Sequence, residues 1–229
     1  MIFSIKQTKK LKVELNKVYF FGELICTIHH TSNEFENLEF KTLKFSDIAL
    51  LSKFANPSAT EPRCLGIAIC DDMIISCDGS VGGYTKFSNS FGIRTMIHIA
   101  LFNILKDLKP INIGVFVNPK NELIIKCNEW IIVSNNFYNE ILLGIITDNK
   151  NYTELKTNPN ALLKELKNYD EKYFKLNNYI FYTKTLIKFL TDYKNVCEIT
   201  LQFSPIFESC KLTCEYKNNF RLLMGVIRE

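Results

Sequence analysis

The sequence predicts an α+β fold in which single helices alternate with groups of antiparallel strands. Short apolar stretches bounded by turn residues recur along the 229 residues, and four other stretches carry apolar residues at helical spacing. One order also repeats, namely a strand, a helix and then about three strands, at 38–88, 91–134 and 176–227. Because short hairpin turns join the strands, neighbouring strands are expected to be antiparallel. A chain of this length holds one large domain or two small ones.

The predicted strands follow the apolar stretches in chain order. The first of them are 2–6, 11–15, 18–28, 65–69 and 73–77. A break at Asp78-Gly79 precedes the next one, because this dipeptide favours a tight turn. The remaining strands are 84–87, 113–117, 122–127, 130–134, 197–203, 211–216 and 220–227. Residues 148–175 supply a helix but leave little room for strands.

Four helices are predicted, at 44–55, 96–109, 159–168 and 183–194. Asn56-Pro57 ends the first helix and Pro110 ends the second, because proline cannot continue a helix. Asn158 is the expected N-cap of the third helix, with Pro159 in its first turn.

Composition excludes several classes of protein. The chain is 47% hydrophobic and holds 18 Phe and 10 Tyr, which is ample for a folded core. No uncharged apolar stretch approaches the ~18 residues that a membrane-spanning helix needs, and the first basic residues follow the apolar start, the reverse of a secretory signal. Because the sequence has no Gly-rich phosphate loop and no nucleophile elbow, we expect no catalytic residues.

The eight cysteines do not form a metal-binding pattern. They include no C-x-x-C pair, and the three histidines do not add the short paired spacings of a zinc site. We therefore expect no metal and no cofactor, and we expect the cysteines to be reduced and buried in a cytoplasmic protein.

Positive charge is concentrated in the predicted helices. The net charge is only +4, yet the four helical windows hold nine lysines against four acidic residues. Lysine decorates any solvated helix face, and for a single helix that interpretation is the better one. Because four helices share the excess, contacts with phosphates that do not read bases are the second interpretation, and these lysines are the candidate nucleic-acid-binding residues. They are Lys44, Lys53, Lys106, Lys109, Lys164, Lys167, Lys184, Lys188 and Lys194.

Several stretches, in the right order, resemble the bacterial sliding clamp, the β subunit of DNA polymerase III. The helix at 48–55 leads to Arg63-Cys-Leu-Gly and then to Ser76-Cys-Asp-Gly79, where the family has an A-T-D-G signature. The helix that follows Tyr182 and the closing strand at 220–228 resemble the family's last helix and last strand. The similarity extends in outline to proliferating cell nuclear antigen. Two departures are Ser80-Val81, where the family has His-Arg, and Gly225, where it has proline.

The resemblance implies a DNA-clamp fold with two clamp domains, at 37–147 and 148–229. Because the second domain lacks strands between its helices, residues 1–36 are expected to complete it. The implied function is a processivity factor, not an enzyme, that encircles double-stranded DNA as a homotrimer and tethers the replicative polymerase. Polymerase and clamp loader would bind through hydrophobic peptide motifs. The implied setting is the cytoplasm of a bacterial cell, with a phage as an alternative source.

The resemblance also implies a pocket for partner peptides between the two domains. The matching positions are Leu65, Cys77, Gly79, Ser80, Val81, Met224, Gly225 and Val226. Core packing is an equally good interpretation of Leu65, Cys77 and Met224. Two alternatives for the whole protein stay open: a clamp-like polymerase accessory protein that does not encircle DNA, and an enzyme on an unrelated α+β fold.

Overall fold

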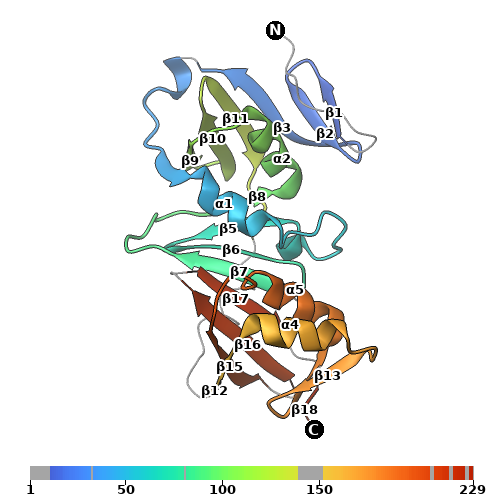
Figure 1. Ribbon diagram of the computed structural model, residues 1–229. Coiled ribbons are helices and arrows are strands. Elements are labelled where there is room, and N and C mark those ends of the chain that lie inside the picture. The colour runs from blue at the N-terminus through green and yellow to red at the C-terminus, as the bar shows by residue number, and fades with distance from the viewer. Residues whose placement is uncertain are drawn as a thin grey trace. The chain divides into compact units, whose positions relative to one another are not determined.

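The computed structural model divides the chain into two compact units (Figure 1). Unit 1 comprises Met1–Ser76 and Phe87–Glu140, and unit 2 comprises Cys77–Lys86 and Ile141–Glu229. The structure describes residues 11–31, 33–79, 81–138, 152–206, 209–216, 219–224 and 227–228. The predicted strand at 2–6 and the predicted domain boundary at 147 both lie outside the described residues.

Unit 1 contains a seven-stranded antiparallel sheet in the order β1-β2-β3-β11-β10-β9-β4. Its strands are β1 (Leu11–Glu14), β2 (Lys17–Phe20), β3 (Glu23–His30), β4 (Lys41–Lys44), β9 (Asn112–Val117), β10 (Glu122–Cys127) and β11 (Trp130–Asn135). Buried aliphatic side chains such as Ile28, Val115 and Ile132 line one face of this sheet, as the alternating pattern predicts.

The described strands of residues 1–36 belong to unit 1 and do not complete the second predicted domain, contrary to the expectation. Strand β3 pairs antiparallel with β11 in unit 1, from Trp130↔His30 to Ser134↔Cys26. The physical reason is a good match of buried side chains, because Cys26 and Ile28 of β3 and Ile132 of β11 are all almost fully buried.

A second group of strands in unit 1 is buried on both faces. It comprises β5 (Gly66–Cys70), β6 (Met73–Cys77) and β8 (Arg94–His98), and β5 pairs antiparallel with both of its neighbours. Gly66 allows a close approach to β8, since a Cβ atom at this position would lie 2.4 Å from the carbonyl oxygen of Ile97. Helices α1 (Phe45–Ser52) and α2 (Ile99–Leu108) pack on each other, and the rings of Phe45 and Phe102 are stacked with centroids 5.4 Å apart.

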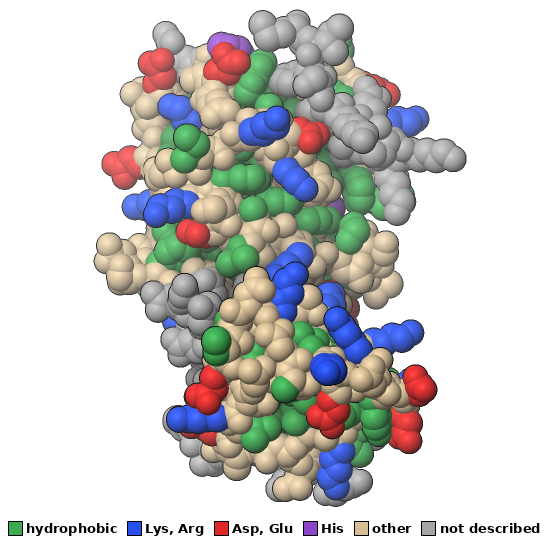
Figure 2. Space-filling model, viewed as in Figure 1, with side chains coloured by type: hydrophobic (Ala, Val, Ile, Leu, Met, Phe, Trp, Pro, Cys, Tyr) green, Lys and Arg blue, Asp and Glu red, His purple; other side chains and the backbone are tan. Residues whose placement is uncertain are grey.

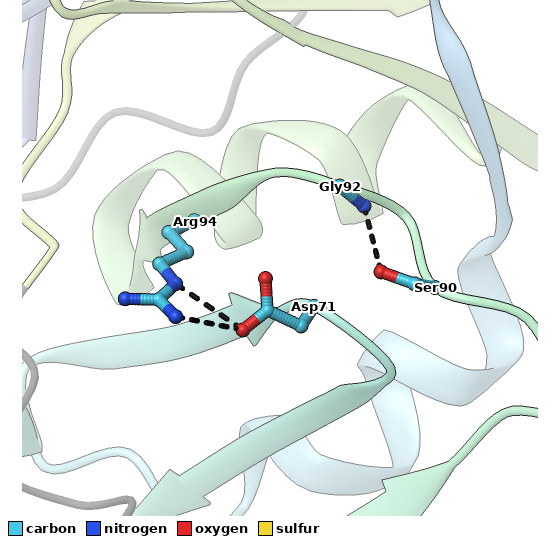
Figure 3. A network of polar contacts seen from close by, with 4 residues as sticks. All are labelled: Asp71, Ser90, Gly92 and Arg94. Atoms are coloured by element: carbon cyan, nitrogen blue, oxygen red, sulfur yellow. Dashed lines mark hydrogen bonds and ion pairs between the residues drawn. The ribbon is translucent and has the colours of Figure 1, made fainter.

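A polar network fixes the turn between β5 and β6 to the start of β8 (Figure 3). The Arg94 guanidinium donates to Oδ2 of Asp71 from Nε at 3.2 Å and from Nη2 at 3.0 Å. The backbone N–H of Asp71 donates to Ile93 O, and Gly92 N–H donates to Ser90 Oγ at 3.1 Å. Because both charged side chains are about half exposed, the ion pair itself contributes at most about 1 kcal/mol.

Unit 2 contains an antiparallel sheet in the order β12-β15-β16-β17-β7. Its strands are β7 (Val81–Lys86), β12 (Thr153–Thr157), β15 (Ile199–Ile206), β16 (Ser209–Tyr216) and β17 (Asn219–Met224). A small sheet has the order β13-β14-β18, formed by β13 (Tyr173–Leu176), β14 (Tyr179–Tyr182) and β18 (Ile227–Arg228). Helices α4 (Pro159–Lys167) and α5 (Thr183–Thr191) lie side by side, and α5 also contacts β17 (Figure 1).

The four predicted helices are confirmed, although each is shorter than its sequence window. The window that begins at 96 includes three residues of β8, because the apolar periodicity continues across the junction between strand and helix. Asn158 is the N-cap of α4 as predicted, and its Oδ1 accepts from the N–H groups of Asn160 and Ala161. Strands β12 and β13 were missed, because both are short and β12 is largely polar.

No helix in the described part of the chain is long and apolar enough to cross a membrane.

Candidate nucleic-acid interface

The α4–α5 pair of unit 2 presents a surface of lysines. Each helix buries one apolar stripe, which comprises Leu162, Leu163 and Leu166 on α4 and Leu186, Phe189 and Leu190 on α5. The opposite faces are exposed and carry four lysines, which we call the lysine surface: Lys164, Lys167, Lys184 and Lys188. Figure 2 shows Lys and Arg side chains gathered over the part of unit 2 where Figure 1 places these helices.

One lysine of the lysine surface, Lys188, already has an acidic partner. Lys188 Nζ forms an ion pair with Oδ2 of Asp78, and the side chains are 49% and 16% exposed. The other carboxylate oxygen of Asp78 accepts the backbone N–H of Val81 at 2.8 Å. Asp78 therefore caps the predicted Asp-Gly turn and also offsets the charge of Lys188, so Lys164, Lys167 and Lys184 are better placed to bind a phosphate.

The sequence predicts the turn at Asp78 but not its contact with Lys188. The Asp-Gly pair predicts a turn, and Gly79 does adopt a positive φ of 99°. The contact with Lys188 joins residues far apart in the chain, and no local pattern signals it.

The other five candidate lysines are also exposed, and four of them lie next to a helix instead of within it. Lys44 ends β4 and precedes α1, Lys53 follows α1, Lys109 follows α2 and Lys194 follows α5. Lys106 lies within α2 next to Asp107, and α1 carries Asp47 without a lysine. The charge excess predicted for all four helices is therefore found within α4 and α5, whereas α1 and α2 are not positively charged.

The expected pocket residues are divided between the two units. Leu65 is half-buried and belongs to unit 1, whereas Cys77, Gly79, Val81 and Met224 belong to unit 2. Cys77 and Val81 are buried, which agrees with the core-packing interpretation of Cys77. Ser80, Gly225 and Val226 lie outside the described residues. The pocket itself stays a prediction.

Seven of the cysteines are thiols outside any disulfide bond. Six of them, at 26, 64, 70, 77, 127 and 214, are buried as expected, but Cys197 is exposed. Burial raises the pKa of Cys26 to about 12 and that of Cys127 to about 11. Because only the thiolate is a strong nucleophile or metal ligand, these two groups are poorly suited to either role.

Comparison with known proteins identifies the fold. No protein-family model matches the sequence, and no curated protein matches it. Among solved structures, the DNA polymerase sliding clamp of Caulobacter crescentus matches with a TM-score of 0.63 at 8% identity, over 82% of this chain and 65% of that one. The DNA polymerase III β subunit of Thermotoga maritima matches with a TM-score of 0.61 at 11% identity, over 96% of this chain and 76% of that one.

A third match is a putative DNA polymerase III β subunit of Eubacterium rectale, with a TM-score of 0.57 at 11% identity over 94% of this chain and 75% of that one. The α+β architecture of helices and antiparallel sheets is therefore that of a DNA clamp. More particularly, it is the fold of the bacterial sliding clamps, of whose length this chain spans between about two thirds and three quarters.

Proposed function

We propose that this protein is a sliding clamp, a DNA polymerase processivity factor that encircles double-stranded DNA. The observation that carries the proposal is the exposed lysine surface on a helix pair of the clamp fold. The resemblance of the sequence motifs to the β subunit family supports it independently. No catalytic group is needed for this function, because a closed ring holds DNA by enclosure.

The lysine surface suits weak, mobile binding. Ammonium groups that contact phosphates release counterions, so binding is independent of base sequence and weakens with salt. A small number of such contacts lets a ring slide along the duplex, whereas tight binding would hold it in place. Three chains with two clamp domains each would give a ring of six domains, which is the arrangement that the resemblance implies.

Partner proteins would bind by inserting an extended peptide with hydrophobic anchors into the expected pocket. The replicative polymerase and the clamp loader are the proposed partners, and the cytoplasm is the proposed location. A polymerase held in this way stays close to the primer end after each dissociation, which is the source of processivity.

A topological experiment tests this function. The protein is assembled on a nicked circular plasmid at low salt, the salt is raised, and the plasmid is then cut once with a restriction enzyme. We expect retention on the circle at high salt and loss after linearisation, because a ring slides off free ends. Equal loss from circular and linear DNA would contradict encirclement and favour the non-encircling accessory protein.

A further inference from the structure

One ion pair joins the lysine surface to the turn between β6 and β7. Lys188 lies on α5, one helical turn after Lys184, so both side chains project from the same exposed face of the helix. The ammonium group of Lys188 pairs with Oδ2 of Asp78, which lies 110 residues earlier in the chain. Lys184 has no such acidic partner among the described residues. The two neighbouring lysines therefore differ chiefly in the presence of Asp78.

The turn holds the carboxylate of Asp78 in place. Its Oδ1 accepts the backbone N–H of Val81 at 2.8 Å, and the backbone N–H of Asp78 donates to Val81 O at 2.9 Å. Gly79 supplies the positive φ of 99° that the turn requires. Cys77 and Val81 are both buried, so the turn is anchored at its two ends. The carboxylate therefore meets Lys188 with little further loss of side-chain freedom.

Helix α5 is fixed to the same unit. Phe189 in its apolar stripe is almost fully buried, and just after the helix the hydroxyl of Tyr193 donates to Cys214 O on β16 at 3.1 Å. Strand β17 contacts α5 and pairs with β7 through Leu223↔Val81. Both partners of the ion pair are thus held by one sheet, so the contact forms in the free protein without any ligand.

A carboxylate and a phosphate offer a lysine the same kind of partner. Both present anionic oxygens to the ammonium group, which carries a single charge and three N–H donors. A DNA phosphate that approaches Lys188 must therefore share the ammonium group with Asp78 or displace the carboxylate. Because the Lys188 side chain is half exposed, water and salt screen the ion pair and keep it weak. The pair is therefore one that a phosphate can exchange.

We propose that Asp78 is an internal competitor of the DNA phosphates for Lys188. In the free protein the carboxylate holds the ammonium group, and on DNA the ammonium group is divided between the two anions. Asp78 thus lowers the affinity of the lysine surface and keeps the number of phosphate contacts small, which favours sliding. This inference deepens the proposed function and rests on it for its ligand, double-stranded DNA.

A double-mutant cycle tests the competition. Asp78→Asn removes the charge but keeps an Oδ1 that can accept the Val81 N–H, and Lys188→Met removes the ammonium group. Fluorescence anisotropy over a salt series measures the affinity for a random duplex. We expect Asp78→Asn to bind roughly twofold to fivefold more tightly than wild type, the range for an exposed ion pair. The slope of log K against log salt should steepen by up to ~0.9, one further phosphate contact.

The same substitution should have no such effect in the Lys188→Met background. As a matched control, Asp170→Asn makes the same change of charge at an exposed residue of the same unit and should tighten binding much less. Lys188→Met alone should cost less affinity than Lys184→Met, because Asp78 already offsets the charge of Lys188. Equal tightening by Asp78→Asn in both backgrounds, or equal losses from the two lysine variants, would overturn the inference.

The retention experiment on the nicked plasmid separates this inference from the proposed function. Retention of the wild type at high salt, without tighter binding by Asp78→Asn, would overturn the inference and leave the function standing. Tighter binding by Asp78→Asn without retention would contradict encirclement and leave the competition standing.

Discussion

At the scale of single residues, His98 is a side chain whose neutral form the fold favours. It ends β8 and is the N-cap of α2, where its Nδ1 accepts the backbone N–H of Ala100 at 3.1 Å. The rings of Phe20 and Phe137 lie against it, with centroids 5.6 and 6.1 Å away. Burial lowers the pKa of His98, because the charged imidazolium is poorly solvated there. Protonation would also remove the acceptor that caps the helix.

The stability of the fold should therefore depend on pH through His98. The unfolded chain binds a proton near pH 6.5 and the folded chain binds it only at lower pH. Stability is thus fully present above about pH 6.5 and is lost as the pH falls below it. Denaturant unfolding at pH 7.5 and 5.5 should show a smaller loss for His98→Asn, which keeps a cap acceptor that does not titrate. An identical loss in wild type and variant would contradict this role.

At the scale of the elements, helices α4 and α5 each have a buried apolar face and an exposed charged face. The apolar stripe holds each helix on its unit, and the opposite face is left free to carry charge. Because these lysines are exposed, substituting them changes the surface without opening a cavity. Lys188 is different, because its reversal would place a carboxylate against Asp78.

Reversal of Lys164, Lys167 and Lys184 to Glu should weaken DNA binding. We expect affinity for a random duplex to fall by more than about tenfold and the slope of log K against log salt to flatten by up to ~3, about 0.9 for each lost phosphate contact. Fluorescence anisotropy over a salt series measures both quantities. The control with the same change of charge is Lys41, Lys120 and Lys156 to Glu, all exposed on strands or turns. Equal effects of the two triple variants would remove the lysine surface from the DNA interface.

At the scale of the whole molecule, the order of strand, helix and strands recurs along the described part of the chain. Four strands, β5 to β8, separate α1 from α2, whereas β13 and β14 are the described strands between α4 and α5. The meander of β1, β2 and β3 precedes both segments. The two halves therefore differ most in the strands between their helices.

The assembled protein should have a mass of about three chains of 26.6 kDa each. Light scattering across a concentration series measures it. We expect the trimer at high concentration and dissociation on dilution if the contacts are limited to edge strands. A monomer at every concentration would favour the accessory protein that does not encircle DNA, and a stable dimer would contradict the three-chain ring.

Much of this architecture was predictable because its causes are local. Helix periodicity, the Asn158 cap and the Asp-Gly turn depend on neighbours a few residues away, and each is found where it was predicted. The four lysines of the lysine surface were also among the candidates. Strand β12 escaped prediction because it carries little apolar alternation, and β13 because it has only four residues.

The sequence by itself determined the four helices, most of the strands and the solvent-exposed lysines, since these follow from the spacing of apolar and polar side chains along the chain. Only the tertiary structure decided that β3 pairs with β11, that Lys188 meets Asp78, and that β13 pairs with β14 in a small separate sheet. Strand pairing and ion pairing join residues remote in sequence. Their outcome depends on which edges and charges the folded chain brings together, and spacing along the chain does not encode it.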